Sequence, residues 1–254
     1  MARELNVHHK TIQIAVHGDL GMKSFAWTPK HLITVKMKAR RFKHAKKVLQ
    51  YYKSSGGKVK IFSDKKIFTL DAVVNRRNDR YLATSIDQGG SHYRTKHPQQ
   101  TMRLGVVASD GQKMLPYFFK PGEKVDTAAY YKVLRYTVLP WLKSSYLSGN
   151  YTWTQDGAPC HNSKKVRILS CQHGQFLAAD MWPSSSPDLN PLDFSVWSVL
   201  ESHDCKTSHA NLTSLQQAIV EAWDNLTEEY IKKSCASVRR RVEAVIANNG
   251  GHIE

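Results

Sequence analysis

The order of strand-like and helix-like segments constrains the fold of this chain more than any other feature of its sequence. Residues 54–57 (SSGG) are typical of a linker or turn, and short β-prone runs begin directly after them. A strand–helix alternation follows, and the final segments show helical spacing only. This order predicts a mixed α/β domain of about 200 residues. We therefore expect two regions, residues 1–54 and residues 55–254.

Apolar runs bounded by turn residues predict the strands of the second region. The first two are separate, because the polar pair Ser63-Asp64 ends the first of them. The next two flank Asp110-Gly111, which is a strong hairpin signal. The predicted strands are 59–62, 67–70, 104–108, 114–119 and 151–155, with a short strand at 176–179.

Capping residues predict the helices of the second region. Asp126 begins one helix, and Asn190-Pro191 begins another with proline at its first position. Thr213 and Gln216 form a capping-box pattern for the next helix. Thr227 begins the last helix, and Asn162-Ser163 is expected to cap a further one. One apolar stripe of the last helix comprises Ile231, Cys235, Val238, Val242 and Val245.

Positive charge dominates the composition and is concentrated before the linker. The chain has 37 Lys and Arg against 21 Asp and Glu, so the net charge is 37 − 21 = +16. Such an excess attracts polyanions, and we favour nucleic acid over an anionic membrane. No apolar run approaches the length of a membrane span. Seven cations without an acid are predicted to contact the DNA backbone: Lys36, Lys38, Arg40, Arg41, Lys43, Lys46 and Lys47.

These cations lie on a predicted amphipathic helix that Thr34 caps. Its apolar face is expected to comprise Val35, Phe42, Ala45, Val48 and Tyr52. A second interpretation of the same basic run is a nuclear-import signal, and both can hold.

Residues 5–16 indicate a turn followed by a short helix, as in part of a helix-turn-helix. Ala2, Leu5, Val7, Ile12 and Val16 would supply its apolar contacts. In that case the side chains of Lys10, Thr11 and Gln13 face a DNA major groove. An ordinary pair of small helices is the alternative.

Three aspartates occupy positions where a metal site for phosphodiester chemistry would need them. Asp64 lies inside an apolar β pattern, Asp156 follows a strand, and Asp193 lies in the first turn of a helix. Two-metal cleavage of phosphodiesters needs acids on rigid elements around one small site. Each acid also has a structural alternative, which is a tight turn, a loop or a helix N-terminus respectively.

Three motifs around these acids resemble the acid-bearing motifs of mariner-superfamily transposases. They are FSDKKIF (62–68), WTQDGAPCH (153–161) and SPDLNPLDF (186–194). Their order matches, and 36 residues lie between Asp156 and Asp193, close to the spacing of that superfamily. An aspartate in third place resembles the mariner and maT-like branches. The sequence is accordingly identified as a member of this superfamily.

The resemblance implies a ribonuclease-H-like core, with a mixed central sheet flanked by helices, preceded by a partial helix-turn-helix and a basic helix. It implies a cut-and-paste DNA transposase in which Asp64, Asp156 and Asp193 bind two Mg²⁺ or Mn²⁺ ions. The implied partners are the inverted repeats at the element's ends, a TA target in double-stranded DNA and a second copy of the chain. It implies a nuclear location, no membrane and no small-molecule cofactor.

Two departures from the family keep other interpretations open. Family members usually carry two N-terminal helix-turn-helix units, so an N-terminally truncated copy is expected. Arg103 stands where the family has an apolar strand residue. The alternatives are an inactive or domesticated DNA-binding remnant and a general ribonuclease-H-like nuclease. Glu201 and Asp188 compete with Asp193 as third acid, and His161 is expected to be structural.

Overall fold

The computed structural model describes residues 5–23, 32–72, 95–158, 161, 163, 175–177, 181–183, 185–204 and 208–253. The chain forms two compact units, Met1–Leu32 and Ile33–Glu254. The strand expected to reach residue 179 and the cap expected at Asn162 lie partly or wholly outside the described residues. None of the described helices combines the length and apolar character that a membrane crossing requires.

In the first unit, a turn leads into helix α1 (His9–Ile14), which continues as a π-helical segment from Ala15 to Asp19. The turn and the short helix were both predicted. The predicted apolar contacts are not formed by the described residues, because neither helical segment has a buried residue and Leu5 is 61% exposed. The described part of this unit therefore has no core of its own.

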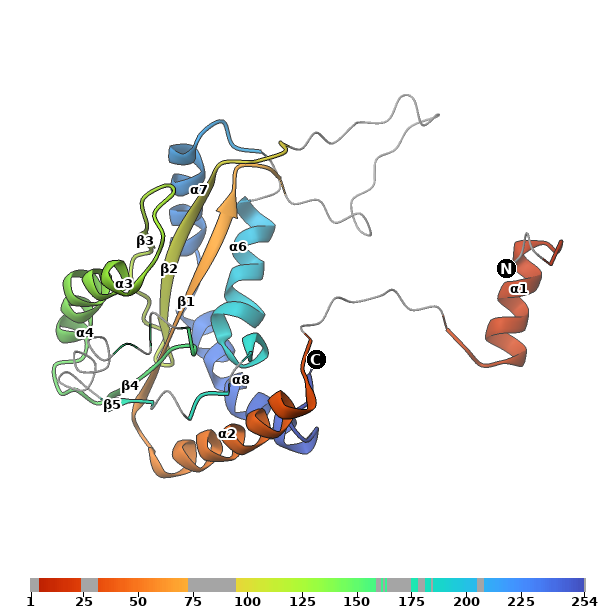
Figure 1. The fold of residues 1–254 in the computed structure, drawn as a ribbon, viewed down its shortest axis with the longest axis horizontal. Helices are drawn as coiled ribbons and strands as arrows, with labels where there is room; N and C mark the ends of the chain where they lie inside the picture. The colour runs from red at the N-terminus through yellow and green to blue at the C-terminus, as the bar shows by residue number, and fades with distance from the viewer. Residues whose placement is uncertain are drawn as a thin grey trace. The chain divides into compact units, whose positions relative to one another are not determined.

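The second unit is built on a five-stranded mixed sheet with the strand order β3-β2-β1-β4-β5 (Figure 1). Strands β1, β2 and β3 are antiparallel neighbours, whereas β4 runs parallel to β1 and to β5. The predicted mixed sheet is thus confirmed. The strands are β1 (Val59–Thr69), β2 (Gln100–Ala108), β3 (Tyr117–Phe118), β4 (Tyr151–Thr154) and β5 (Gln175–Phe176).

Strand β1 corrects the prediction of two short strands, because it continues without a break through Ser63 and Asp64. Its ladder with β2 is continuous, and Asp64 lies opposite Gly105. The acid is tolerated inside the strand because its carboxylate accepts a hydrogen bond from Trp197. A polar residue in an apolar run therefore marks a site here rather than a turn.

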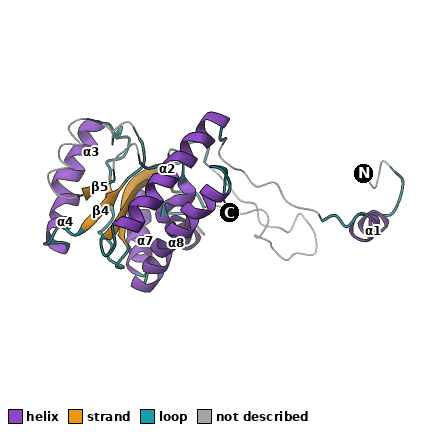
Figure 2. Cartoon of the chain, turned by 90° about the horizontal axis from the view of Figure 1, so that it is seen from below, coloured by secondary structure: helices purple, strands orange, loops and turns teal. Residues whose placement is uncertain are grey.

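The helices of this unit lie on both faces of the sheet (Figure 2). Asp126 and Thr227 cap the helices predicted for them. Helix α7 (Leu212–Asp224) departs from the prediction, because Asn211 and Ser214 form its capping box instead of Thr213 and Gln216. The helices are α2 (Val35–Ser54), α3 (Thr127–Val133), α4 (Leu139–Ser145), α6 (Trp197–Asp204), α7 (Leu212–Asp224) and α8 (Glu228–Ala247), with π-helical segments at Leu134–Val138 and Leu192–Val196 and a 3₁₀ turn at Pro187–Leu189.

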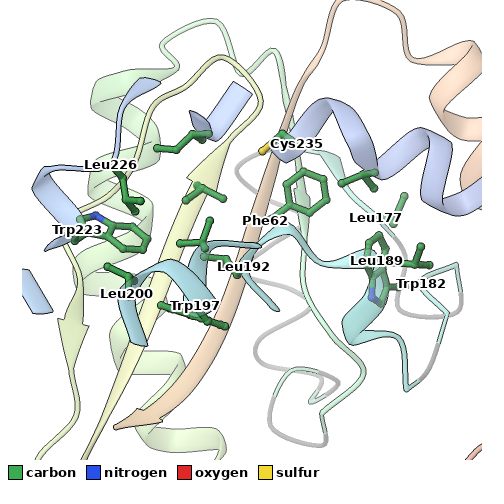
Figure 3. Packing of buried hydrophobic residues seen from close by; sticks show 14 of the residues in the cluster. Phe62, Leu177, Trp182, Leu189, Leu192, Trp197, Leu200, Trp223, Leu226 and Cys235 are labelled. Atoms are coloured by element: carbon green, nitrogen blue, oxygen red, sulfur yellow. The ribbon is translucent and has the colours of Figure 1, made fainter. Parts of the chain in front are cut away.

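Side chains of β1 alternate between two apolar clusters, one on each face of the sheet. Phe62 and Phe68 pack with α2, α6, α7 and α8, whereas Ile61 packs with α3 and α4. Figure 3 shows the first cluster, in which Trp197 and Trp223 lie close together. Asp64 is two residues from Phe62 in the same strand, so its side chain lies on the same face of the sheet as this cluster.

The basic helix α2 belongs to the second unit, so the boundary falls earlier than the expected division between residues 54 and 55. Ala45 and Val48 are buried in the same cluster as Val238 and Val242 of α8. The predicted apolar face of α2 is wrong at its start, because Val35 is 85% exposed.

Candidate active site

Asp64 lies in the central strand of the sheet and points toward α6. The indole Nε1 of Trp197 donates a hydrogen bond of 2.6 Å to its Oδ2. Burial raises the pKa of Asp64, and the nearby charge of Asp156 acts in the same direction. The hydrogen bonds from Trp197 and from the backbone of Lys65 oppose this rise. The carboxyl is therefore held in place but stabilised only in part as an anion.

Asp156 follows the end of β4, which runs parallel to β1 with Thr154 paired to Phe62. This register brings the residues after β4 beside Asp64 on β1. Asp156 accepts a hydrogen bond from the backbone N–H of Ala158 and lies 2.5 Å from Nδ1 of His161. Burial acts to raise the pKa of Asp156, but the hydrogen bonds that it accepts from His161 and from the backbone of Ala158, together with the charge of Lys65, hold this pKa below its usual range.

His161 is oriented by a lysine that the sequence analysis did not assign to the site. The Lys65 Nζ lies 2.9 Å from Nε2 of the imidazole. An ammonium can only donate, so Nε2 accepts and the ring proton sits on Nδ1, facing Asp156. The ring also stacks on Tyr130 with centroids 4.2 Å apart. His161 is therefore buried and oriented, and it fixes the position of Asp156.

Asp193 begins the helical segment that leads into α6. Asn190 anchors this start, because its side chain donates to the carbonyl of Ser63 and accepts from the backbone N–H of Leu192. The backbone of Asp193 in turn donates to the carbonyl of Asn190. Asn190 thus ties the third motif to the residue directly before Asp64.

Asp193 lies near enough to Asp64 and Asp156 for their charges to act on its pKa. Burial raises this pKa to about 8, and the charges of Asp64 and Asp156 and a hydrogen bond with Asp64 contribute to the rise. Lys66 opposes the rise. The three carboxyls therefore interact electrostatically, and each carboxylate disfavours ionisation of its neighbour.

Both rivals for the third acid have other partners. Glu201 forms an ion pair of 3.0 Å with Lys66. The carboxylate of Asp188 accepts hydrogen bonds from both terminal nitrogens of Arg41. Neither contact leads to Asp156, whereas Asp193 interacts with both other motif acids.

The raised pKa of Asp193 predicts the pH dependence of stability in the metal-free protein. Its value of about 8 exceeds the ordinary 3.8, so between these values the folded state binds a proton that the unfolded state releases. The free energy of unfolding is therefore expected to fall between about pH 4 and about pH 8. Thermal unfolding in EDTA at both ends of this range measures the effect. An Asp193→Asn variant should lose most of the slope, and an equal slope in both proteins would contradict the assignment.

Known proteins that are similar to this chain include transposases. No protein-family model matches the sequence. The Tc1 transposase of Caenorhabditis elegans is 26% identical over 255 residues, covering 96% of this chain and 85% of that protein. The Tc3 transposase of the same organism is 25% identical over 83% of this chain and 63% of its own length. The chain is therefore similar to the Tc1 and Tc3 transposases over most of its length.

Solved structures show that the fold of this chain is the expected one. The Mos1 transposase paired-end complex with the left transposon end superposes with a TM-score of 0.81 at 19% identity, covering all of this chain and 74% of that one. The catalytic domain of the Mos1 mariner transposase superposes with a TM-score of 0.70, covering 90% of this chain and all of that one. The predicted ribonuclease-H-like architecture is therefore confirmed.

The donor chemistry of Asp64, Asp156 and Asp193 fits a divalent metal. Within the described part of the chain, no three His, Cys, Asp or Glu side chains are arranged closely enough to hold a metal ion. The three carboxyls nevertheless supply the hard oxygen donors that Mg²⁺ and Mn²⁺ prefer. The charges of Asp64 and Asp156 raise the pKa of Asp193, and a cation would relieve this repulsion. Mos1 complexes have been solved with Mn and with Mg, which is consistent with use of a divalent metal.

The predicted DNA-contacting residues divide into two groups. Lys10, Thr11 and Gln13 are exposed on α1 of the first unit. On α2, five of the seven cations are exposed and Lys47 is half-buried. Arg41 is fully buried, so the prediction that it contacts DNA is wrong. The exposed cations of α2 are Lys36, Lys38, Arg40, Lys43 and Lys46.

Arg41 instead joins three separate segments of the second unit. Its Nε donates to the carbonyl of Gly250, and its Nη1 donates to the carbonyl of Ser185. It also forms a two-point ion pair with Asp188 at 3.0 and 2.8 Å. No residue near Arg41 in the sequence indicates this role, because Asp188 is 147 residues away in the chain.

Proposed function

We propose that this chain is a metal-dependent DNA transposase that cuts at the ends of its element and joins them to target DNA. The convergence of Asp64, Asp156 and Asp193 from three motifs carries the proposal. The homology to the Tc1 and Tc3 transposases and the fold shared with Mos1 support it. A TA dinucleotide as target is part of the proposal and rests on the family resemblance.

In the proposed mechanism, Asp64, Asp156 and Asp193 hold two divalent cations, Mg²⁺ or Mn²⁺. Bound at this position, such ions supply activation of the attacking water or 3′-hydroxyl and stabilisation of the departing oxygen. The chain's own residues prepare the ligands. Lys65 fixes the tautomer of His161, and His161 holds Asp156 as an anion. Asn190 ties the segment that carries Asp193 to the strand that carries Asp64.

We propose double-stranded DNA as the partner, in the form of the element's inverted repeats and the target. The Mos1 structures include a complex with a transposon end and a strand transfer complex. The exposed cations of α2 contact the phosphate backbone and give affinity without sequence information. Lys10, Thr11 and Gln13 on α1 reach the major groove. A homodimer in the DNA complex and a nuclear location complete the proposal.

Nicking of supercoiled plasmid tests the proposal. One plasmid carries the genomic DNA from both sides of the coding sequence, and a matched plasmid lacks it. We expect Mg²⁺-dependent nicking that EDTA abolishes and that is faster on the first plasmid.

Each alternative predicts a different outcome of the same assay. Equal nicking of both plasmids would favour a general nuclease. DNA binding that weakens steeply with salt but is never followed by cleavage would favour an inactive DNA-binding remnant.

A further inference from the structure

We infer that Trp197 is a positioning residue that sets the orientation of the Asp64 carboxylate, and that Gly105 and Arg103 hold its ring in place. The inference rests on the proposed function, because the orientation matters most when Asp64 binds a cation. None of these three residues belongs to the acid triad.

The hydrogen bond between Trp197 and Asp64 is the first observation. The indole is 1% exposed, and its N–H donates to Oδ2 of Asp64 at 2.6 Å. Trp197 is the first residue of α6, so it lies one turn beyond Asp193 on the helical segment that both share. An indole N–H can only donate, so it favours the ionised carboxylate and restricts rotation of the carboxylate group. The same segment thus supplies one acid and orients another.

Gly105 provides the space that this contact needs. It lies opposite Asp64 on β2. A Cβ at this position would lie 2.5 Å from Cη2 of Trp197 and 3.2 Å from Cη2 of Trp223. The contact with Trp197 is closer than real Cβ atoms come and is made with a rigid ring, and the contact with Trp223 would require a small shift of that ring. The absence of a side chain at residue 105 therefore allows the indole to lie against the sheet with its N–H at Asp64.

Arg103 contacts the indole from the next position on the same face of β2. It is 0% exposed, and its guanidinium carbon lies 4.9 Å from the ring of Trp197 and 4.6 Å from that of Trp223. A cation over an aromatic face is attracted to it, and more strongly when both are removed from water. Arg103 and Gly105 thus restrain the ring on the side of the sheet. This gives a role to the charged residue that departs from the family pattern.

Mn²⁺ binding by the full chain, followed by electron paramagnetic resonance without DNA, tests the inference. Trp197→Phe removes the N–H donor and is expected to weaken Mn²⁺ affinity by about tenfold or more, as the loss of other partners that orient metal ligands does. Trp223→Phe is the matched control, because its Nε1 donates to the carbonyl of Met114 and to no acid. We expect the control to bind Mn²⁺ as the wild type does. Urea unfolding of both variants shows whether any difference follows stability instead.

A shape-preserving substitution keeps the test decisive if Trp197→Phe folds poorly. Site-specific replacement of Trp197 by benzothienylalanine exchanges N–H for sulfur and retains the bicyclic ring. Weaker Mn²⁺ binding with an unchanged unfolding midpoint would support the inference, and wild-type affinity would overturn it. If the wild-type protein bound no Mn²⁺, or if Asp156→Asn left its Mn²⁺ binding unchanged, the proposed function would be overturned and the inference with it. The two failures are therefore distinguishable.

Discussion

Replacement of Asp156 by Asn is expected to abolish metal-dependent DNA cleavage while leaving the fold intact. The amide has nearly the volume of the carboxylate, and its oxygen can still accept the hydrogen bond from the N–H of His161. It lacks the negative charge that draws a divalent cation to the site. Loss of a residue that merely orients a metal ligand costs about 10–100-fold. Loss of a ligand should therefore reduce plasmid nicking by more than about 100-fold.

Asp126→Asn is the matched control for this experiment. Asp126 caps α3 by accepting from the backbone N–H of Ala129. Asn is as good a cap as Asp, so the same chemical change is expected to leave both stability and nicking unchanged. Nicking by Asp156→Asn at a rate similar to that of Asp126→Asn would contradict the proposed mechanism.

The positions of the three acids could be predicted because strand, loop and helix signals surround each of them. The continuity of β1 could not. A local pattern treats Ser63-Asp64 as the end of a strand, whereas the ladder to β2 and the Trp197 hydrogen bond carry the strand through it. Both partners are remote in sequence, so no window around Asp64 contains the information. Tertiary contacts decide where a polar residue interrupts an apolar run.

The same limit applies to the basic helix α2. Its existence and its Thr34 cap followed from local spacing and were confirmed. Local spacing did not predict which of its cations are exposed and which are buried, because charge alone assigns every cation to the surface. Arg41 is buried because a carboxylate and several carbonyls from the other end of the chain surround it. Likewise, the lysine that orients His161 was visible in the sequence only as the neighbour of Asp64.

Replacement of Arg41 by Met is expected to lower the free energy of unfolding by about 3–5 kcal/mol. The substitution leaves Asp188 and several carbonyls at the chain's C-terminal end without their donor. Removing one partner of a buried ion pair is costly because the other charge stays desolvated. Urea unfolding followed by tryptophan fluorescence measures the loss. A second replacement, Asp188→Leu, is expected to recover a large part of the lost free energy of unfolding, because the double variant no longer leaves an unpaired charge away from water.

Arg40→Ala separates the structural role of α2 from its role in DNA binding. Arg40 is exposed and directly precedes Arg41, so its removal should change the free energy of unfolding by less than about 0.5 kcal/mol. The substitution should weaken DNA binding and reduce the slope of the logarithm of the binding constant against the logarithm of the salt concentration by about 1, which corresponds to one phosphate contact. Arg41→Met, measured at a temperature where it is folded, should retain the wild-type salt dependence. If Arg41→Met instead unfolded like the wild type and lost a phosphate contact, Arg41 would be a DNA ligand after all. Its buried position against Asp188 and Gly250 predicts the opposite.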